Sequence, residues 1–324
     1  MTHKPCCEFF LASCVSDGGV YRYRLYENGK VEKLFKIDIP SPMYLALERE
    51  RLWVVARAPF EDSDESGYTA FDAKSGKCEK EMQGTGGRVA CHISFCGDDV
   101  YCANYASGSV FKSSHTVVAH KGRGIDPKRQ EAPHVHAVVP SPSGKYLFAT
   151  DLGLDTVFVY DRDLSLLSSA RVPDGAGVRH GVFSHDGKYF YCVNEMGGSV
   201  SVFAFSAPHL SLLNTVSILP SGYGGVGSGA AIKLSESGER LYVTERATER
   251  IITLKVEGES LSVLASTDTH GKEPRDLTLL AHERYAIVTN QFSDNVSIYK
   301  LDKDGIPVFL SRFNIPAPLC VIPT

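Results

Sequence analysis

Basic and acidic side chains recur at matching points of several similar segments in the second half of the chain. His136, Arg179 and Arg275 each stand at the start of an apolar run, and Glu195 follows the run that comes after Arg179. An imidazole or a carboxylate can deprotonate water, and a guanidinium can bind an oxyanion, a carboxylate or a phosphate. These residue types are suited to opening a lactone with water or to binding a small anion.

A second set of polar residues occupies equivalent offsets, where the next run of each segment ends. These residues are Asp151, Asn194, Arg246, Asn290 and Gln291. Asparagine and aspartate are favoured at turns, which would explain some of them without any function. Two arginines and a glutamate that share one cavity are costly to bury unless they are paired or bind an anion. The pattern therefore favours an anion-binding site.

The segments that carry these residues are internal repeats, at residues 136–152, 179–196, 230–246 and 275–291. Each has an apolar run, a polar turn and a second run rich in β-formers, and two further strand-like runs follow. The turns recur every 43 to 51 residues, which is the range for a four-stranded propeller blade. No segment has a sustained helical period, so we expect an all-β fold with very low helix content.

Less regular copies of the repeat lie upstream. Two of them begin at Met43 and Ala90, and a first unit at Phe9 lacks its leading strand. The C-terminal segment 317–322 offers a spare strand that could complete this unit. We therefore predict a seven-bladed β-propeller of four-stranded antiparallel blades, with residues 1–324 as a single domain and the ring closed by the C-terminal strand.

This fold would gather the polar residues at one place. The first two strands of a blade are antiparallel hairpin partners, so the start of the first and the end of the second lie at the same edge. In a propeller these edges meet round one mouth of the central channel. His92 begins a comparable run at a different offset, and it either contributes to this cavity or packs beside it.

Composition excludes several classes of partner. Lys and Arg total 34 against 38 Asp and Glu, a net charge of −4, which argues against nucleic acid or an anionic membrane surface. No apolar run approaches the roughly 20 residues of a membrane helix. Residues 1–8 lack the apolar core of a signal peptide.

The nine cysteines include no CxxC pair, so we expect a reduced, cytoplasmic location, with Cys102 and Cys192 as core residues.

Other motifs are weaker. His134 and His136 would share a face of one strand and could form a metal pair, but no third ligand has suitable spacing, so we expect no metal and no cofactor. The glycine-rich stretch 222–229 does not open a helix after a strand, which predicts a loop and not a phosphate-binding motif. The basic run 121–129 predicts a solvated loop, from whose end Arg129 could reach the mouth.

Several motifs resemble those of the seven-bladed lactonase family, which includes propeller-type 6-phosphogluconolactonases and the fungal carboxy-cis,cis-muconate cyclase. They are the RQE-x-PHxH loop at residues 129–136, DLGLD at 151–155, the Arg179-His180 and Asn194-Glu195 pairs, Glu273-Pro274-Arg275 and Pro318-Leu319-Cys320. The resemblance extends over nearly the whole chain. It implies that the catalytic residues are a histidine, which is His136 or else His134, together with Arg179 and Glu195. Many relatives have histidine where this chain has Lys233, which leaves the substrate open.

The residues and the resemblance together predict a lactonase that acts on a sugar-acid lactone. His136 or Glu195 would deprotonate water, and Arg179 would stabilise the oxyanion or bind an anionic group of the substrate. Substrate would also be bound by His134, Arg275, Arg246, Asn194, Asp151, Asn290, Gln291 and His92. The same groups suit a muconate-type cyclase, since the residues do not choose between hydrolysis and lactonisation. A second alternative is a non-catalytic propeller that binds a protein or a small acid.

Overall fold

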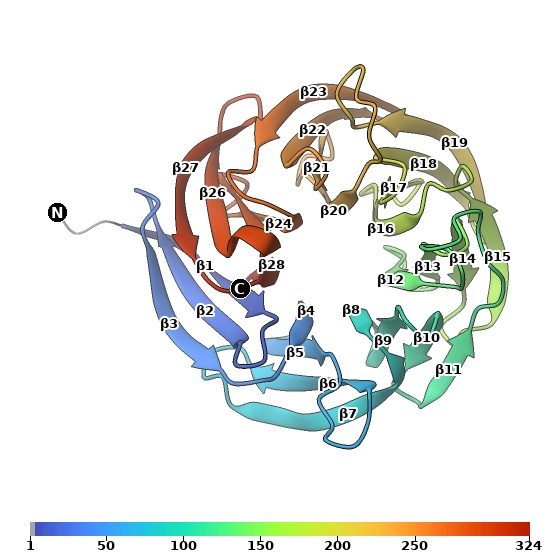
Figure 1. The fold of residues 1–324 in the computed structure, drawn as a ribbon, viewed down its shortest axis with the longest axis horizontal. Helices are drawn as coiled ribbons and strands as arrows, with labels where there is room; N and C mark the ends of the chain where they lie inside the picture. The colour runs from blue at the N-terminus through green and yellow to red at the C-terminus, as the bar shows by residue number, and fades with distance from the viewer. Residues whose placement is uncertain (1–3) are drawn as a thin grey trace.

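The computed structural model describes residues 4–324, and in these residues seven four-stranded antiparallel sheets form a ring round a central channel (Figure 1). Apart from the strands there is a single 3-10 turn, η1 (Gln291–Ser293). The prediction of an all-β, seven-bladed propeller is confirmed. Residues 1–3, which belong to the predicted domain and to the predicted N-terminal segment 1–8, lie outside the described residues. The assignment of residues 1–324 to one domain stays a prediction.

In each blade the strands run in order from the channel outward. Blade 1 consists of β28 (Pro318–Pro323), β1 (Pro5–Ser13), β2 (Gly19–Tyr26) and β3 (Val31–Ile37). Blade 2 consists of β4 (Pro42–Glu48), β5 (Arg51–Ala56), β6 (Glu65–Asp72) and β7 (Cys78–Arg88). Blade 3 consists of β8 (Ala90–Cys96), β9 (Asp99–Asn104), β10 (Ser109–Lys112) and β11 (Thr116–Ala119). Blade 4 consists of β12 (Val135–Pro140), β13 (Leu147–Asp151), β14 (Thr156–Tyr160) and β15 (Leu166–Arg171).

The last three blades, like blade 4, correspond to the four regular sequence repeats. Blade 5 consists of β16 (Val178–Phe183), β17 (Tyr189–Asn194), β18 (Ser199–Ser206) and β19 (His209–Ser217). Blade 6 consists of β20 (Gly229–Leu234), β21 (Arg240–Glu245), β22 (Arg250–Glu257) and β23 (Ser260–Asp268). Blade 7 consists of β24 (Pro274–Leu280), β25 (Tyr285–Asn290), β26 (Asn295–Leu301) and β27 (Pro307–Asn314). Of the glycine-rich stretch 222–229, residues 222–228 form a loop that enters blade 6, as predicted, and Gly229 begins β20.

The C-terminal strand closes the ring. β28 pairs antiparallel with β1, from Phe9 opposite Pro323 to Ser13 opposite Pro318, and becomes the innermost strand of blade 1 (Figure 1). Without β28, the inner edge of β1 would be an unpaired sheet edge, which is prone to aggregation. The predicted exchange of a C-terminal strand into the first blade is thus confirmed.

The core lies between neighbouring blades. Each sheet packs against two others, so its middle strands are buried on both faces and form continuous apolar runs. Blades 4 and 5, for example, are joined by a cluster that contains Phe148, Phe183 and Phe190. Cys102 and Cys192 are buried in such clusters, as predicted. No helix in residues 4–324 has the length and apolar character that crossing a bilayer requires.

A β-bulge occurs near the start of every innermost strand. In β12, Val135 pairs with Asp151 and Ala137 pairs with Thr150, which leaves His136 as the extra residue. The same irregularity falls at Met43, Cys91, Arg179, Arg275 and Leu319, and in β20 it extends over Ala230 and Ala231. A bulge bends its strand and changes the direction of the extra side chain. The repeat therefore presents one bulged position per blade at one end of the channel.

Removal of residues 318–324 should strongly destabilise the protein, because Cys320 and Val321 are buried against β1. We expect the free energy of unfolding to fall by roughly 5 kcal/mol or more and aggregation to rise. Urea unfolding and light scattering measure both effects. Removal of the exposed Thr324 alone is the control and should change stability little. Equal stability of the two truncated chains would contradict the closing role of β28.

Candidate functional site

A cavity of about 400 Å³ lies at the end of the channel where the inner strands begin. Among its lining residues are the bulged Met43, Cys91, His136 and Arg275. A smaller cavity of about 30 Å³ shares these four residues and is also lined by Arg179. The charged side chains round the two cavities are Arg57, Arg129, Arg179, Arg246, Arg275, Glu195, Glu273 and Asp276. We refer to the larger space as the arginine cavity.

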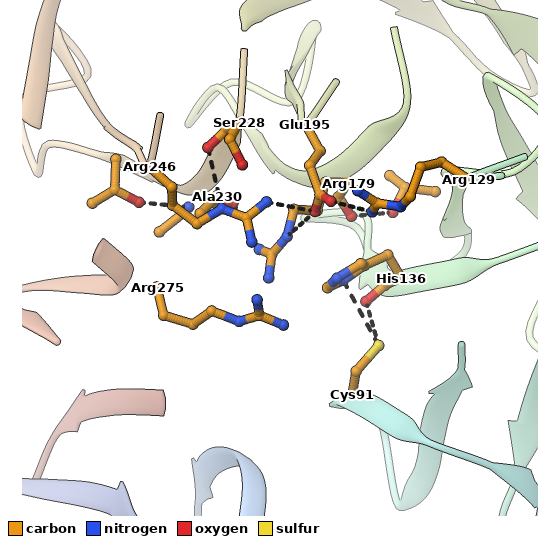
Figure 2. Close-up of polar contacts among 12 residues, drawn as sticks. Cys91, Arg129, His136, Arg179, Glu195, Ser228, Ala230, Arg246 and Arg275 are labelled. Atoms are coloured by element: carbon orange, nitrogen blue, oxygen red, sulfur yellow. Dashed lines mark hydrogen bonds and ion pairs between the residues drawn. The ribbon is translucent and has the colours of Figure 1, made fainter. Parts of the chain in front are cut away.

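Glu195 is the centre of this charge cluster. Its Oε2 accepts a hydrogen bond from Arg179 Nε at 3.0 Å and lies 3.0 Å from Arg246 Nη2. Its Oε1 accepts a hydrogen bond from Arg129 Nη2 (Figure 2). Burial by itself would raise the pKa of Glu195, but Arg246 and Arg179 outweigh burial and hold it well below its ordinary value. Glu195 is therefore an ionised counterion at neutral pH and is poorly suited to act as a base.

The arginines are also fixed by backbone carbonyls and by a second glutamate. Arg179 donates to Ala230 O at 2.8 Å, and Arg246 donates to Ser228 O at 3.2 Å and to Glu273 Oε1 at 2.8 Å. Burial, followed by repulsion from Arg275, lowers the pKa of Arg179 to about 10, so this guanidinium remains charged at neutral pH.

Positive charge exceeds negative charge in the arginine cavity. Arg57 forms no ion pair with any residue in 4–324, and the nearest carboxylate oxygen to Arg275 is Glu273 Oε1 at 3.5 Å. Arg275 extends toward Arg179 and His136 from the opposite side of the channel (Figure 2). Several guanidinium groups with few counterions favour an anionic ligand here.

His136 offers a neutral imidazole to both cavities. It is 5 % exposed, and its Nδ1 lies 3.7 Å from Cys91 Sγ, while the Cys91 thiol donates to His136 O at 3.3 Å. No residue in 4–324 forms a hydrogen bond with Nε2. Burial, followed by repulsion from Arg179, holds the pKa of His136 well below its ordinary value. A neutral ring with a free nitrogen can accept a proton from water.

His134 does not share this position. Its Nδ1 lies 3.2 Å from Tyr105 O, its Nε2 lies 3.3 Å from Glu131 Oε1, and its ring stacks on Tyr105 at 4.5 Å between centroids. The prediction that both histidines point to one face assumed a regular strand, and the bulge at His136 breaks that alternation. Of the two histidines, the structure brings only His136 into the cavity lining.

Asp151, Asn194 and Asn290 are buried within their own blades and do not line the arginine cavity. Asp151 accepts a hydrogen bond from His134 N at 2.8 Å. The amide of Asn194 donates to Ser199 Oγ at 2.9 Å, and that of Asn290 donates to Thr269 O at 3.1 Å. These three residues end the second strand of each blade and tie it to neighbouring segments. The side chain of the following Gln291 lies 3.8 Å from Cys14 Sγ, also outside the cavity.

In four of the blades, unlike blade 7 with Gln291, the first residue after the second strand faces the cavity. Arg57 follows β5, Tyr105 follows β9, Glu195 follows β17 and Arg246 follows β21, and all four line the arginine cavity. Successive side chains of a strand point to opposite sides, so one step along the chain separates the structural residues from the lining residues.

Sequence reasoning missed Cys91, Arg57 and Glu273 as lining residues. Cys91 occupies the bulged position in blade 3, and Arg57 occupies the position of Glu195 in blade 2. Comparison of the weak early repeats with the later ones could have found Arg57, but the first hairpin of blade 3 is shorter, with Cys96 paired to Asp99, so an offset counted from the turn leads to Val89 and not to Cys91. Glu273 precedes β24 by one residue and was visible only as part of the Glu273-Pro274-Arg275 motif.

The rings of Tyr44, His92 and His180 form a cluster beside the small cavity, and two of them, Tyr44 and His180, line it. The centroid of His92 lies 4.6 Å from that of Tyr44 and 5.5 Å from that of His180. Burial, followed by repulsion from Lys233 and Arg179, lowers the pKa of His92 to about 3. His92 packs in this ring cluster and lies outside the lining of both cavities.

Comparisons with known proteins agree with this architecture. A family model described as "Lactonase, 7-bladed beta-propeller" matches residues 9–323. The chain is 32% identical over 309 residues to the uncharacterized protein YwcC of Lactococcus lactis, covering 88% of this chain and 89% of YwcC. It is 27% identical over 331 residues to a Bacillus subtilis protein named 6-phosphogluconolactonase, covering 94% and 93%. The periplasmic gluconolactonase PpgL of Pseudomonas aeruginosa matches with a TM-score of 0.85 and 27% identity, covering 97% and 98%.

Mild acid should destabilise the protein through three histidines of the channel. The folded-state pKa values of His92, His136 and His180 are depressed, so below about pH 6.5 the unfolded chain binds more protons than the folded one. Stability should therefore fall as the pH decreases from about 6.5 to 5, with each histidine contributing up to about 1.4 kcal/mol per pH unit. Urea unfolding at several pH values measures the slope.

His92→Phe should make the fall in unfolding free energy with decreasing pH shallower, by up to about 1.4 kcal/mol per pH unit, which is the contribution of one histidine. Replacement of the exposed His209 by Phe is the matched control and should leave the slope unchanged. An identical slope in wild type and His92→Phe would contradict a neutral, buried His92.

Proposed function

Because the chain belongs to the seven-bladed β-propeller lactonase family, we propose that it hydrolyses the lactone of a sugar acid in the arginine cavity. The observation that carries this proposal is a neutral imidazole, His136, that faces a cavity with an excess of guanidinium groups. A base and a set of oxyanion-binding groups are the two requirements for attack of water on a lactone carbonyl.

His136 is the base in the proposed reaction. The water oxygen attacks the carbonyl carbon while Nε2 of His136 accepts the proton of the water, and the carbonyl electrons move onto oxygen. Arg179 and Arg275 stabilise this oxyanion. The carbon–oxygen bond of the ring then breaks, and the leaving oxygen takes the proton from His136. The resulting carboxylic acid releases a proton to solvent.

Glu195 has a positioning task in this scheme. Its carboxylate binds Arg129, Arg179 and Arg246 at once, which holds Arg129 and Arg246 in the lining of the arginine cavity and Arg179 in the lining of the small cavity. This assignment selects His136 from the two candidate bases, because both carboxylate oxygens of Glu195 are bound by arginines, whereas no residue in 4–324 forms a hydrogen bond with Nε2 of His136.

The proposed substrate carries a negative charge. A phosphate or a carboxylate would supply a counterion to Arg57, which forms no ion pair in residues 4–324, and to Arg275, which shares Glu273 with Arg246. A relative named 6-phosphogluconolactonase and a structural neighbour named gluconolactonase support a sugar-acid lactone as the core of the substrate. A carboxymuconate also carries carboxylates that suit the arginines, and a purely binding propeller would hold a similar acid without converting it. Assays of both lactone and muconate distinguish these alternatives from the proposal.

His136→Gln and Arg179→Lys should each reduce kcat/KM for lactone hydrolysis by about 100-fold or more, because one removes the base and the other removes the bidentate guanidinium. The assay is a pH-stat titration over a panel of phosphorylated and unphosphorylated lactones, with the spontaneous rate subtracted. Arg171→Ala, which removes an exposed arginine on β15, is the matched control and should retain full activity. Undiminished turnover in both site variants would contradict the proposal.

The pH dependence of the rate should report the depressed pKa of His136. Because the neutral ring is the active form, kcat/KM should stay constant as the pH falls from 8 to 6, through the pKa of about 6.5 of an ordinary histidine. Initial rates at constant ionic strength measure this profile. An inflection close to pH 6.5 would argue against His136 as the base.

A further inference from the structure

The small cavity beside the arginine cavity has the size and the lining of a water site. Its volume is about 30 Å³, and its polar lining residues include Tyr44, His136, Arg179 and His180. A buried water molecule needs about 10–15 Å³ of accessible volume and two to four polar partners. The space is too small for a sugar lactone but sufficient for water.

His180 lines this cavity with both ring nitrogens unused by the protein. Its Nε2 is buried and has no hydrogen-bond partner, and no residue in 4–324 forms a hydrogen bond with its Nδ1. The ring meets His92 and Tyr44 edge to face, at interplanar angles of 83° and 80°. Nδ1 is not among the fully buried atoms without a partner, so of the two ring nitrogens it is the one with access to the cavity. In the tautomer with the proton on Nε2, Nδ1 is a free acceptor at the cavity.

We propose that the small cavity holds the water molecule that opens the lactone, and that His180 positions this water through a hydrogen bond accepted at Nδ1. The proposal rests on the proposed function and adds His180 to it as a positioning residue. The ring centroids of His136 and His180 lie 5.0 Å apart, a separation that one water molecule can bridge between Nε2 of His136 and Nδ1 of His180.

The bridge would orient the water for attack. Both of its hydrogens point to the imidazoles, so a lone pair of its oxygen is free to face the carbonyl carbon in the arginine cavity. During attack, the hydrogen shared with His136 is transferred, and the hydrogen shared with His180 stays on the incoming oxygen. Burial, followed by repulsion from Arg179, holds the pKa of His180 well below its ordinary value, so the ring remains a neutral acceptor.

A crystal structure of the full-length wild-type protein tests the water site without any assumption about activity. We expect an ordered water within about 2.7–3.2 Å of His180 Nδ1, and we expect this water to be lost in His180→Phe. A dry cavity, or a water that contacts other groups and not His180, would overturn the inference.

Kinetics test the role of the water. His180→Phe should lower kcat by about 100-fold with KM unchanged, because orientation and not substrate binding is lost. His180→Asn places an amide close to the position of Nδ1 and should retain activity within about 10-fold of wild type. His209→Asn is the matched surface control and should have wild-type kcat. Unfolding curves of each variant separate a folding defect from a catalytic one.

The outcomes are distinguishable. Equal losses in His180→Phe and His180→Asn, or a raised KM with an unchanged kcat, would overturn the positioning role. A wild-type protein that hydrolyses no lactone would contradict the proposed function and with it the reactive role of the water, and the crystal structure would still decide whether the site binds water. A dry cavity in an active protein would contradict this inference alone.

Discussion

The site depends on one buried carboxylate that three arginines share. Glu195 is 5 % exposed, and removal of its charge would leave Arg129, Arg179 and Arg246 without their common counterion. An uncompensated charge in a buried place is costly, so the cluster holds its geometry only as a unit. The cluster still does not neutralise the cavity, because Arg57 forms no ion pair among residues 4–324 and Arg275 shares its one carboxylate partner, Glu273, with Arg246. Affinity for an anion follows from that imbalance.

The charge cluster acts on the histidines of the channel as well as on a ligand. Repulsion from Arg179 adds to burial in depressing the pKa values of His92, His136 and His180. The rings therefore stay neutral, and neutral imidazoles can accept protons where imidazolium ions cannot. The same arginine that would bind an oxyanion thus keeps the proposed base in its active form.

Repetition explains how residues far apart in the chain come together. Each innermost strand carries a bulge at the same point, and in four of the blades the residue that follows the second strand turns toward the channel. His136 and Arg179 use the first of these positions, and Glu195 and Arg246 use the second. A propeller can therefore change its site by substitution at these positions while the blades keep their packing.

The repeat, the closing role of segment 317–322 and the family resemblance were all predictable from the sequence, because strand periodicity and turn spacing are local properties of the chain. The gathering of His136, Arg179, Glu195, Arg246 and Arg275 was also predictable, since equivalent offsets in a ring meet at one mouth. Only the tertiary structure determines which of the polar residues next to one another in the chain face the cavity. It separated His136 from His134 by a bulge, and it turned Asp151, Asn194 and Asn290 into their blades. Strand register and the direction of a side chain depend on pairing with distant residues, so these details emerge only when the sheets are assembled.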